Sequence, residues 1–169
     1  MAKERSNIAL TELTLHALEA QPFLKWAGGK RALLPGLLKH VPKRFRMYGE
    51  PFFGGGALFY KLQPKFSIIG DINLELINTM RAVRDIPGQV VRALKKHRYD
   101  KDYFYKIREQ NPEDLSQAEV AARMIFLNRV GFNGLYRVNG SGKFNVPFGK
   151  YTNPKILDEP NLYACSEVL

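Results

Sequence analysis

A run of glycines and a later acidic residue have the spacing of a ligand site. The stretch Glu50-Pro-Phe-Phe-Gly-Gly-Gly leaves a predicted strand and enters a helical pattern that begins at Ala57. Glycines at such a turn let backbone amides approach a ligand, and the helix N-terminus adds a positive dipole end. Asp71 ends the next predicted strand, 17 residues after Gly54, near the spacing of roughly 20 residues at which an acid holds ribose hydroxyls in nucleotide-binding sheets. The two features together favour an adenosine-containing ligand over a tight turn that only packs helix on strand.

The same glycine run excludes two common nucleotide sites. No Gly-Lys-Ser or Gly-Lys-Thr ends it, so it is not the P-loop of an enzyme that hydrolyses ATP or GTP. A dehydrogenase fingerprint would need a glycine three positions after Gly56, where Phe59 stands. A ligand without a triphosphate therefore fits the sequence best.

The only tryptophan of the chain lies in a second glycine-containing stretch. Trp26 stands beside Gly28 and Gly29 and between Lys25 and Lys30. An indole face stacks on flat groups and attracts a positive centre by a cation–π interaction. The alternative for a single tryptophan is a place in the hydrophobic core, and only its glycine and lysine neighbours favour a ligand contact.

A third stretch, residues 128–150, mixes basic and amide side chains with aromatic ones. Its two β-prone runs, residues 135–138 and 143–146, flank Asn139-Gly-Ser-Gly, which predicts a β-hairpin. Arginine makes bidentate contacts with guanine, asparagine pairs with adenine or phosphate, and an apolar side chain can wedge into an opened base step. Composition alone leaves a DNA-reading hairpin and a solvated hairpin with one buried aromatic side equally acceptable.

The helices and strands that must position these stretches predict an α/β protein. Residues 47–53 and 66–71 are predicted strands, each followed by a helical pattern that starts near Ala57 or Leu74. Two strand-to-helix units in succession favour a parallel sheet. After Asp85 come polar-rich helical stretches over residues 87–97, 102–110 and 116–130, and Ser116 with Glu119 predicts a capping box for the last of them. The first 20 residues, with Leu10, Leu13 and Leu18, read as a short amphipathic appendage.

Charge and composition narrow the class of partner. The 169 residues hold 26 Lys and Arg against 16 Asp and Glu, a net charge of +10, which predicts a polyanionic partner, either nucleic acid or an anionic membrane surface. No apolar run approaches the roughly 18 residues of a membrane span and the N-terminus lacks the pattern of a signal peptide, so no membrane partner is expected. One cysteine, Cys165, and three scattered histidines predict neither a disulfide nor a zinc site and favour a cytoplasmic location.

Together these stretches closely resemble the Dam-type DNA adenine N6-methyltransferases, which methylate adenine in duplex DNA with S-adenosylmethionine as cofactor. The similar segments are Phe23-Leu-Lys-Trp-Ala-Gly-Gly-Lys, Glu50-Pro-Phe-Phe-Gly-Gly-Gly and Asp71-Ile-Asn, in the family's order. The resemblance implies a Rossmann-like methyltransferase sheet, incomplete here, with an inserted helical and β-hairpin target-recognition domain. It implies these cofactor-binding residues: Trp26, Ala27, Gly28, Lys30, Phe52, Gly54 and Asp71.

The hairpin is similar to the family's target-recognition hairpin, and the resemblance implies duplex DNA as the partner. Arg137 would read a guanine, Phe132 and Leu135 would wedge into the duplex, and Lys25 and Pro147 would each face a base. The remaining implied DNA-binding residues, which contact phosphates or flank the hairpin, are Arg129, Asn133, Asn139, Asn145 and Lys150. A GATC site is the first expectation for the recognition sequence, and related hairpins read other adenine-containing sites. The resemblance also implies a cytoplasmic, nucleoid-associated location of the bacterial or phage type.

One family motif is absent from these residues. The catalytic Asp-Pro-Pro-Tyr would accept protons from the adenine amine and stack on the flipped base, and the sequence holds no Pro-Pro dipeptide. We therefore expect an appendage (1–20), cofactor-binding residues 21–84, a target-recognition domain (85–150) and a return segment (151–169), with the catalytic loop on a missing half or a second chain. These residues alone are expected to bind DNA, to bind the cofactor weakly and to catalyse nothing. The alternative is a DNA-binding or regulatory module, derived from this family, that transfers no methyl group.

Overall fold

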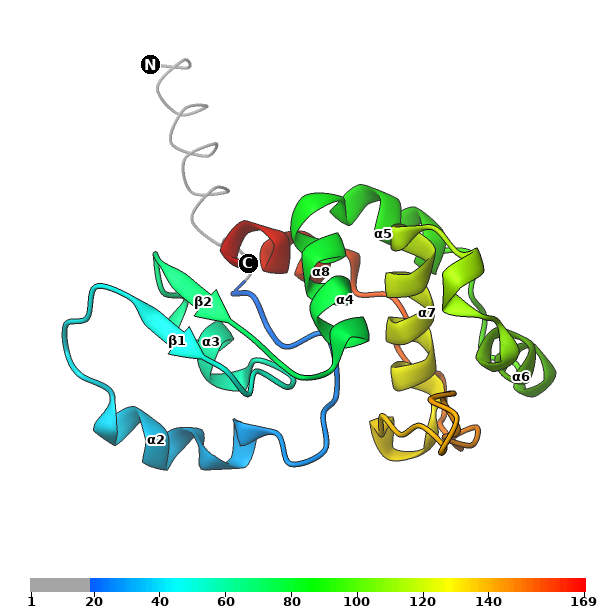
Figure 1. Ribbon diagram of the computed structural model, residues 1–169, viewed down its shortest axis with the longest axis horizontal. Coiled ribbons are helices and arrows are strands. Elements are labelled where there is room, and N and C mark those ends of the chain that lie inside the picture. The colour runs from blue at the N-terminus through cyan, green and yellow to red at the C-terminus, as the bar shows by residue number, and fades with distance from the viewer. Residues whose placement is uncertain (1–18) are drawn as a thin grey trace, which may run out of the picture.

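A small parallel sheet lies at one end of the molecule, and a group of packed helices forms the other (Figure 1). The structure is a computed structural model that describes residues 19–169, so the predicted amphipathic helix near the N-terminus lies outside the described residues. Strands β1 (Tyr48–Glu50) and β2 (Ser67–Ile69) run parallel, with Gly49 opposite Ile68. β1 leads through the glycine loop into α3 (Ala57–Leu62), and β2 leads past Asp71 into α4 (Leu74–Asp85). Both predicted strand-to-helix units and their parallel pairing are confirmed, although each strand is only three residues long.

The remaining described helices lie before and after the two strand-to-helix units. Before the sheet come the short 3-10 helix η1 (Lys30–Leu33) and α2 (Leu34–His40). After α4 come α5 (Pro87–Leu94), α6 (Lys101–Glu109), the 3-10 turn η2 (Pro112–Asp114), α7 (Gln117–Val130), the 3-10 turn η3 (Phe132–Gly134) and α8 (Glu159–Val168). The three helical stretches expected after Asp85 are therefore confirmed as α5, α6 and α7.

Side-chain caps fix where several of these helices begin. The predicted capping box is present at the start of α7, where Ser116 accepts from the Glu119 amide and the Glu119 carboxylate accepts from the Ser116 amide. Asn73 accepts from the Leu76 amide at the start of α4, and Asp100 accepts from the Tyr103 amide at the start of α6. Each cap satisfies a backbone donor that the first helical turn leaves without an intrahelical partner.

The hydrophobic core is centred on α7, which packs against α4, α5 and α6, while α8 packs against α4 and α5. Ala122, Phe126 and Val130 of α7 are fully buried. The same cluster includes Phe23 from the segment before η1 and Phe59 from α3. One core therefore joins helices on both sides of Asp85 to the segments that carry the glycines and Trp26.

The predicted hairpin over residues 135–146 is antiparallel, but its pairing is shorter than expected. Val138 and Phe144 form an isolated bridge, and the Asn145 amide donates to the Arg137 carbonyl. A longer ladder would use the Asn145 carbonyl, which instead accepts from the Arg137 guanidinium at 3.1 Å. The loop is closed by Asn139, whose side-chain oxygen accepts from the amides of Ser141 and Lys143. Side-chain hydrogen bonds thus replace part of the predicted strand pairing.

Candidate cofactor pocket and nucleic-acid interface

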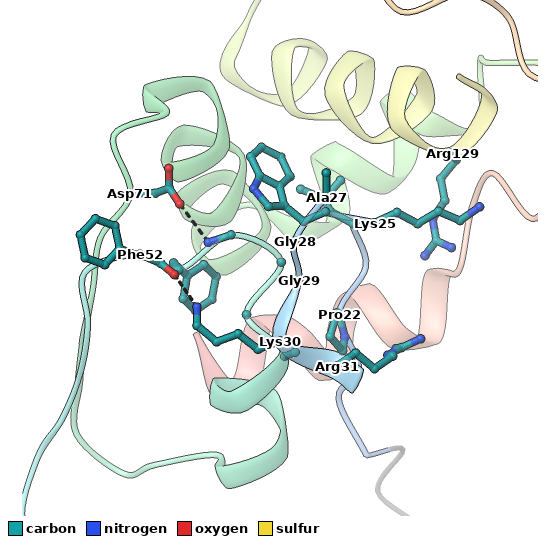
Figure 2. Close-up of a pocket in the computed structure, with 17 residues that line it drawn as sticks. Pro22, Lys25, Ala27, Gly28, Gly29, Lys30, Arg31, Phe52, Asp71 and Arg129 are labelled. Atoms are coloured by element: carbon teal, nitrogen blue, oxygen red, sulfur yellow. Dashed lines mark hydrogen bonds between the residues drawn. The ribbon is translucent and has the colours of Figure 1, made fainter. Parts of the chain in front are cut away.

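The seven residues singled out for a cofactor line a single pocket of about 560 Å³. It lies between the segment around Trp26 and the loop after β1, with Phe52 and Asp71 on one side and Lys25 and Arg129 on the other (Figure 2). Cavities of this size hold ligands of the size of a nucleoside derivative. The structure thus brings together residues from three separate stretches of sequence.

Gly54 and Asp71, paired by spacing in the sequence, are in direct contact. The Gly54 amide donates to Asp71 Oδ2 at 2.9 Å, and the Asn73 amide donates to Oδ1 at 3.0 Å. Gly54 has φ +55°, and a Cβ at this position would lie 2.9 Å from Cδ1 of Trp26, so only glycine fits without movement of the indole. Each carboxylate oxygen can accept a further hydrogen bond. Asp71 is therefore held rigidly and keeps acceptor capacity on the pocket side.

Glu50 and Lys30 form a charged pair next to the glycine loop. Glu50, at the end of β1, is 6% exposed, and its Oε2 accepts from the Tyr48 hydroxyl at 2.7 Å. Lys30 Nζ lies 2.8 Å from Glu50 Oε1 as an ion pair whose geometry is not that of a hydrogen bond, and the ammonium donates to the Phe52 carbonyl at 2.6 Å. Burial and the neighbouring Glu50 carboxylate raise the pKa of Tyr48 well above its usual value. Lys30 thereby ties the 3-10 helix η1 to the glycine loop and places one cation in the pocket lining.

Trp26 is neither fully exposed nor fully buried. Its indole is half-buried and stacks on the ring of Tyr136, with centroids 5.4 Å apart and planes 22° apart. It lines the pocket while it packs against the core. Both interpretations of this residue, a pocket wall and a packing residue, therefore describe part of its environment.

The cationic side of the pocket includes two of the residues expected to contact DNA. Lys25 and Arg129 both line it, together with Arg31. The Lys25 ammonium lies 4.8 Å from the centroid of the Tyr151 ring, a cation–π contact. Burial lowers the pKa of Arg129, partly offset by the negative charge of Asp158. The pocket is thus continuous with the base of the hairpin.

The hairpin presents some of its expected DNA contacts and shields others. Phe132 is 49% exposed, and Asn133 is exposed with φ +53°. Leu135, the second expected wedge, is half-buried against the core. Arg137 is exposed and donates from Nε to the Asn145 side chain at 2.7 Å. The other expected contacts differ in exposure: Asn139, Pro147 and Lys150 are exposed, and Asn145 is half-buried.

Four residues that connect these parts were not singled out from the sequence. The buried Asn128 side chain accepts from the Lys25 amide and donates to the carbonyls of Lys25 and Gly134, at 2.8, 2.8 and 2.9 Å. It thereby fixes the segment before Trp26 to the start of the hairpin. The other three, Glu75, Arg123 and Tyr136, form a polar network. Arg123 and Asn128 carried a signal, because they are polar residues that stand among the apolar residues of α7.

Within residues 19–169, no three His, Cys, Asp or Glu side chains lie close enough to hold a metal ion. Nor is any helix in this part of the chain long and apolar enough to cross a membrane.

Comparison with known proteins places this arrangement in a family. The chain is 42% identical over 163 residues to the Type II methyltransferase M1.LlaDCHI of Lactococcus lactis subsp. cremoris, a match that covers 93% of this chain and 57% of that protein. It is 41% identical over 173 residues to the Type II methyltransferase M.MjaIII of Methanocaldococcus jannaschii, covering 90% and 60%. It is 36% identical over 149 residues to the DNA adenine methylase of Escherichia coli, covering 86% and 53%. The chain thus spans little more than half the length of these relatives.

A family model described as D12 class N6 adenine-specific DNA methyltransferase matches residues 26–169. This range includes Trp26, the glycine loop, Asp71 and the whole hairpin. The chain therefore belongs to the D12 class N6 adenine-specific DNA methyltransferase family.

Proposed function

We propose that the protein acts in the transfer of a methyl group from S-adenosylmethionine to N6 of adenine in duplex DNA. These residues would supply the cofactor pocket and the DNA-reading surface. The observation that carries the proposal is the contact of the Gly54 amide with Asp71 in a pocket walled by Trp26. The relatives named above as adenine methylase and Type II methyltransferases support it.

The pocket residues fit the chemical groups of this cofactor. Asp71 offers carboxylate oxygens to ribose hydroxyls, and the exposed ring of Phe52 and the indole of Trp26 offer faces for an adenine ring. Lys30 supplies a positive charge for a carboxylate. When bound, S-adenosylmethionine supplies a methyl group on a positively charged sulfonium. The roles of Ala27, Gly28 and Gly54 are to let backbone amides approach the ligand without side chains in the way.

We infer that β1 and β2 belong to a Rossmann-like methyltransferase sheet and that residues 85–150 form the target-recognition insertion. Two strand-to-helix units in a parallel pair support the first part. The basic hairpin at the end of α7 supports the second. Residues 21–84 and 151–169 then belong to the catalytic domain, where α8 returns to pack on α4.

The hairpin would read DNA with the residues that it exposes. Arg137 would leave its hydrogen bonds to Asn145 and contact a guanine, and Phe132 would enter the opened base step with Leu135 behind it. The further contacts that we assign are Lys25 and Pro147 on bases, and Arg129, Asn133, Asn139, Asn145 and Lys150 on phosphates or beside them. A GATC sequence is the first site to test.

The chemical step also needs an acceptor for the amine protons of the flipped adenine, whose lone pair is delocalised into the ring. Of the carboxylates near the pocket, Asp71 accepts from two backbone amides and Glu50 is paired with Lys30. We therefore assign binding and orientation to these residues, and we place the proton acceptor on an Asp-Pro-Pro-Tyr segment outside the 169 residues.

Ligand-dependent melting tests the proposal. S-adenosylmethionine at about 100 times its Kd should stabilise the native chain by about 2.7 kcal/mol, because a ligand bound only to the native state shifts unfolding by mass action. A duplex with an adenine-containing site should bind in the same assay series. DNA binding without any effect of the cofactor would favour the other candidate, a DNA-binding module without methyl transfer, which the absence of a Pro-Pro dipeptide in these residues also supports.

A further inference from the structure

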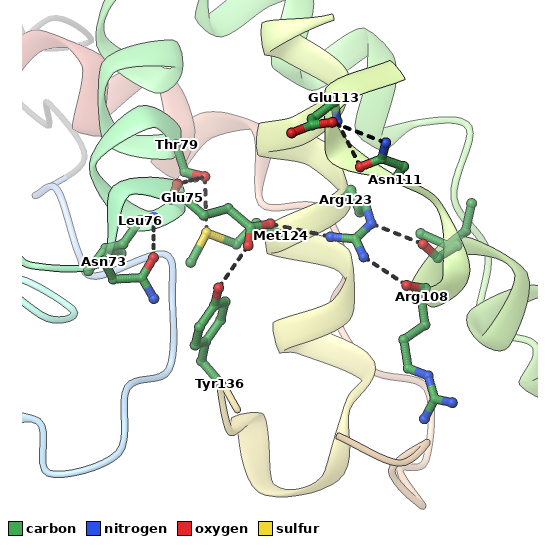
Figure 3. A network of polar contacts seen from close by, with 11 residues as sticks. Asn73, Glu75, Leu76, Thr79, Arg108, Asn111, Glu113, Arg123, Met124 and Tyr136 are labelled. Atoms are coloured by element: carbon green, nitrogen blue, oxygen red, sulfur yellow. Dashed lines mark hydrogen bonds and ion pairs between the residues drawn. The ribbon is translucent and has the colours of Figure 1, made fainter. Parts of the chain in front are cut away.

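Tyr136 touches both halves of the proposed site. Its ring stacks on Trp26, a wall of the pocket, and its hydroxyl donates to Glu75 Oε2 at 2.8 Å. It stands between Leu135 and Arg137 in the hairpin sequence. Figure 3 shows the Tyr136 hydroxyl turned toward Glu75. A single side chain thus joins the pocket wall to the segment proposed to read DNA.

The acceptor of this hydrogen bond is itself firmly held. Glu75 Oε1 lies 3.3 Å from Nη1 of Arg123, which is only 3% exposed. Arg123 also donates to the carbonyls of Ile107 and Arg108, at 3.0 and 2.8 Å, where α6 ends. Buried polar groups whose hydrogen bonds are all made form rigid networks, and the loss of one partner strongly lowers the stability of the fold. Glu75 is therefore a fixed point against which the Tyr136 hydroxyl is positioned.

A second set of contacts connects the pocket to Glu75. The Asn73 amide donates to Asp71, the acid proposed to hold ribose, and the Asn73 side chain caps α4 by accepting from the Leu76 amide. Glu75 lies in the first turn of that helix. A shift of Asp71 or of Trp26 would therefore be transmitted to Glu75 and Tyr136 through short contacts.

We propose that Tyr136 is a positioning residue that couples occupancy of the cofactor pocket to the conformation of the hairpin. The proposal rests on the function proposed above and adds to it a linkage between the two ligands. A ligand that fixes the Trp26 indole also fixes the Tyr136 ring stacked on it. The hydrogen bond from Tyr136 to Glu75 then fixes the hairpin backbone next to Arg137. By thermodynamic reciprocity, DNA on the hairpin must tighten cofactor binding by the same factor by which cofactor tightens DNA binding.

The chain offers a direct probe, because Trp26 is its only tryptophan. Intrinsic fluorescence can be titrated with S-adenosylmethionine in the absence and presence of a saturating duplex that contains the methylation site. The ratio of the two Kd values is the coupling factor, expected to be about 5 or more for the unmodified chain. Tyr136→Phe keeps the stacked ring and removes only the hydroxyl. We expect it to keep the cofactor Kd without DNA within about two-fold and to lower the coupling factor to below about 2.

Two tyrosine variants serve as matched controls. Tyr163→Phe removes a hydroxyl from the partly exposed outer side of α8 and should leave the coupling factor unchanged. Tyr99→Phe removes a hydroxyl that donates to the Gly149 carbonyl and accepts from the Tyr151 amide at the end of the hairpin. It should weaken DNA binding without changing the coupling factor, because Tyr99 is not one of the residues that line the pocket and does not stack on Trp26. A merely structural role of Tyr136 would give the result of Tyr99→Phe.

The two proposals fail in different ways. If the unmodified chain binds neither ligand, the proposed function is wrong. If it binds both and Tyr136→Phe retains the full coupling factor, or if the unmodified chain shows no coupling, the positioning role is wrong while the proposed function stands. A DNA-induced change of Trp26 emission that disappears in Tyr136→Phe would support the positioning role independently of the Kd values.

Discussion

At the scale of single residues, Asp71 is the side chain on which cofactor binding should depend most directly. Asp71→Asn keeps the size of the side chain but replaces one acceptor oxygen by a donor and removes the charge. Hydrogen bonds to charged groups contribute about 1.5–3 kcal/mol, so we expect the Kd for S-adenosylmethionine to rise by about 10-fold or more. Calorimetric titration measures it, with Asp85→Asn, at an exposed ion pair with Arg84, as the control. An unchanged Kd in Asp71→Asn would remove this residue from the site.

Arg137 and Lys150 should differ in the kind of DNA binding that they support. Arg137→Ala is expected to cost about 1–3 kcal/mol on the cognate duplex and much less on a scrambled one, because a bidentate contact to guanine carries the discrimination. Lys150→Ala should weaken binding to both duplexes equally, as loss of a phosphate contact does. Fluorescence anisotropy with both duplexes gives the two ratios. Equal losses on cognate and scrambled DNA for Arg137→Ala would show that this side chain does not read a base.

The residue scale also shows what the sequence can predict. The pairing of Gly54 and Asp71 could be predicted because each stands at the carboxyl end of a predicted strand, and these ends lie together in neighbouring parallel strands. Tyr136 and Asn128 were not visible as connecting residues, because their roles arise from contacts with Trp26 and Lys25, about one hundred residues away in the chain. Sequence patterns indicate the local environment of a residue, but they do not identify contact partners that are distant in the chain.

At the scale of elements, the capping box of α7 offers a test of local stability. Ser116→Ala removes the acceptor for the Glu119 amide and the partner of its carboxylate. We expect a loss of about 1 kcal/mol in the free energy of unfolding. Urea denaturation measures it, and Thr152→Ala, at an exposed loop position, is the control. A loss below about 0.3 kcal/mol would mean that the first turn of α7 is held by core packing alone.

The segment between α5 and α6 adds a dependence of stability on pH. His97 stacks on Phe126 at 4.6 Å, and burial, with a smaller effect of Lys96, lowers its pKa to about 4. An unfolded histidine titrates near 6.5, so the unfolded state binds more protons between these values and stability falls as pH drops from about 6.5 to 4. With partial exposure taken into account the loss is about 2 kcal/mol.

His97→Phe keeps the stacked ring and removes the titrating group. Urea unfolding at a series of pH values should therefore give a shallower decline for this variant than for the unmodified chain. All other titrating groups are common to the two proteins, so the difference between the curves isolates His97. Parallel curves would contradict the assignment.

Elements were predicted better than their lengths. Helices α5, α6 and α7 follow from periodicity and caps, since both are encoded within a few residues. The strands are shorter than predicted, and the hairpin over residues 135–146 keeps one bridge, next to which the Asn145 carbonyl accepts from the Arg137 guanidinium. Competition between a side chain and the backbone for one acceptor depends on conformation, so a β-prone pattern does not resolve it.

At the scale of the whole molecule, one core connects the proposed cofactor and DNA sites. Leu76 and Met80 of α4 lie in the same buried cluster as Val90 of α5 and Leu162 of α8. The predicted boundary at residues 84 and 85 is thus crossed by continuous packing. Packed interiors transmit displacement with little compression, which gives the contacts of Tyr136 a rigid frame.

The net charge of +10 leads to a prediction about the whole surface. If Arg129 and Lys150 each neutralise a phosphate, a plot of log affinity for duplex DNA against log salt concentration should have a slope of about −1.8 or steeper, since each contact contributes about −0.9. Lys150→Ala should reduce the steepness by about 0.9. The affinity for S-adenosylmethionine, measured in the same buffers, should change little, because a small ligand carries no condensed counterions to release. A nearly flat DNA plot would mean that the excess positive charge lies away from the DNA, and it would remove the main physical reason for placing a polyanion on this face of the molecule.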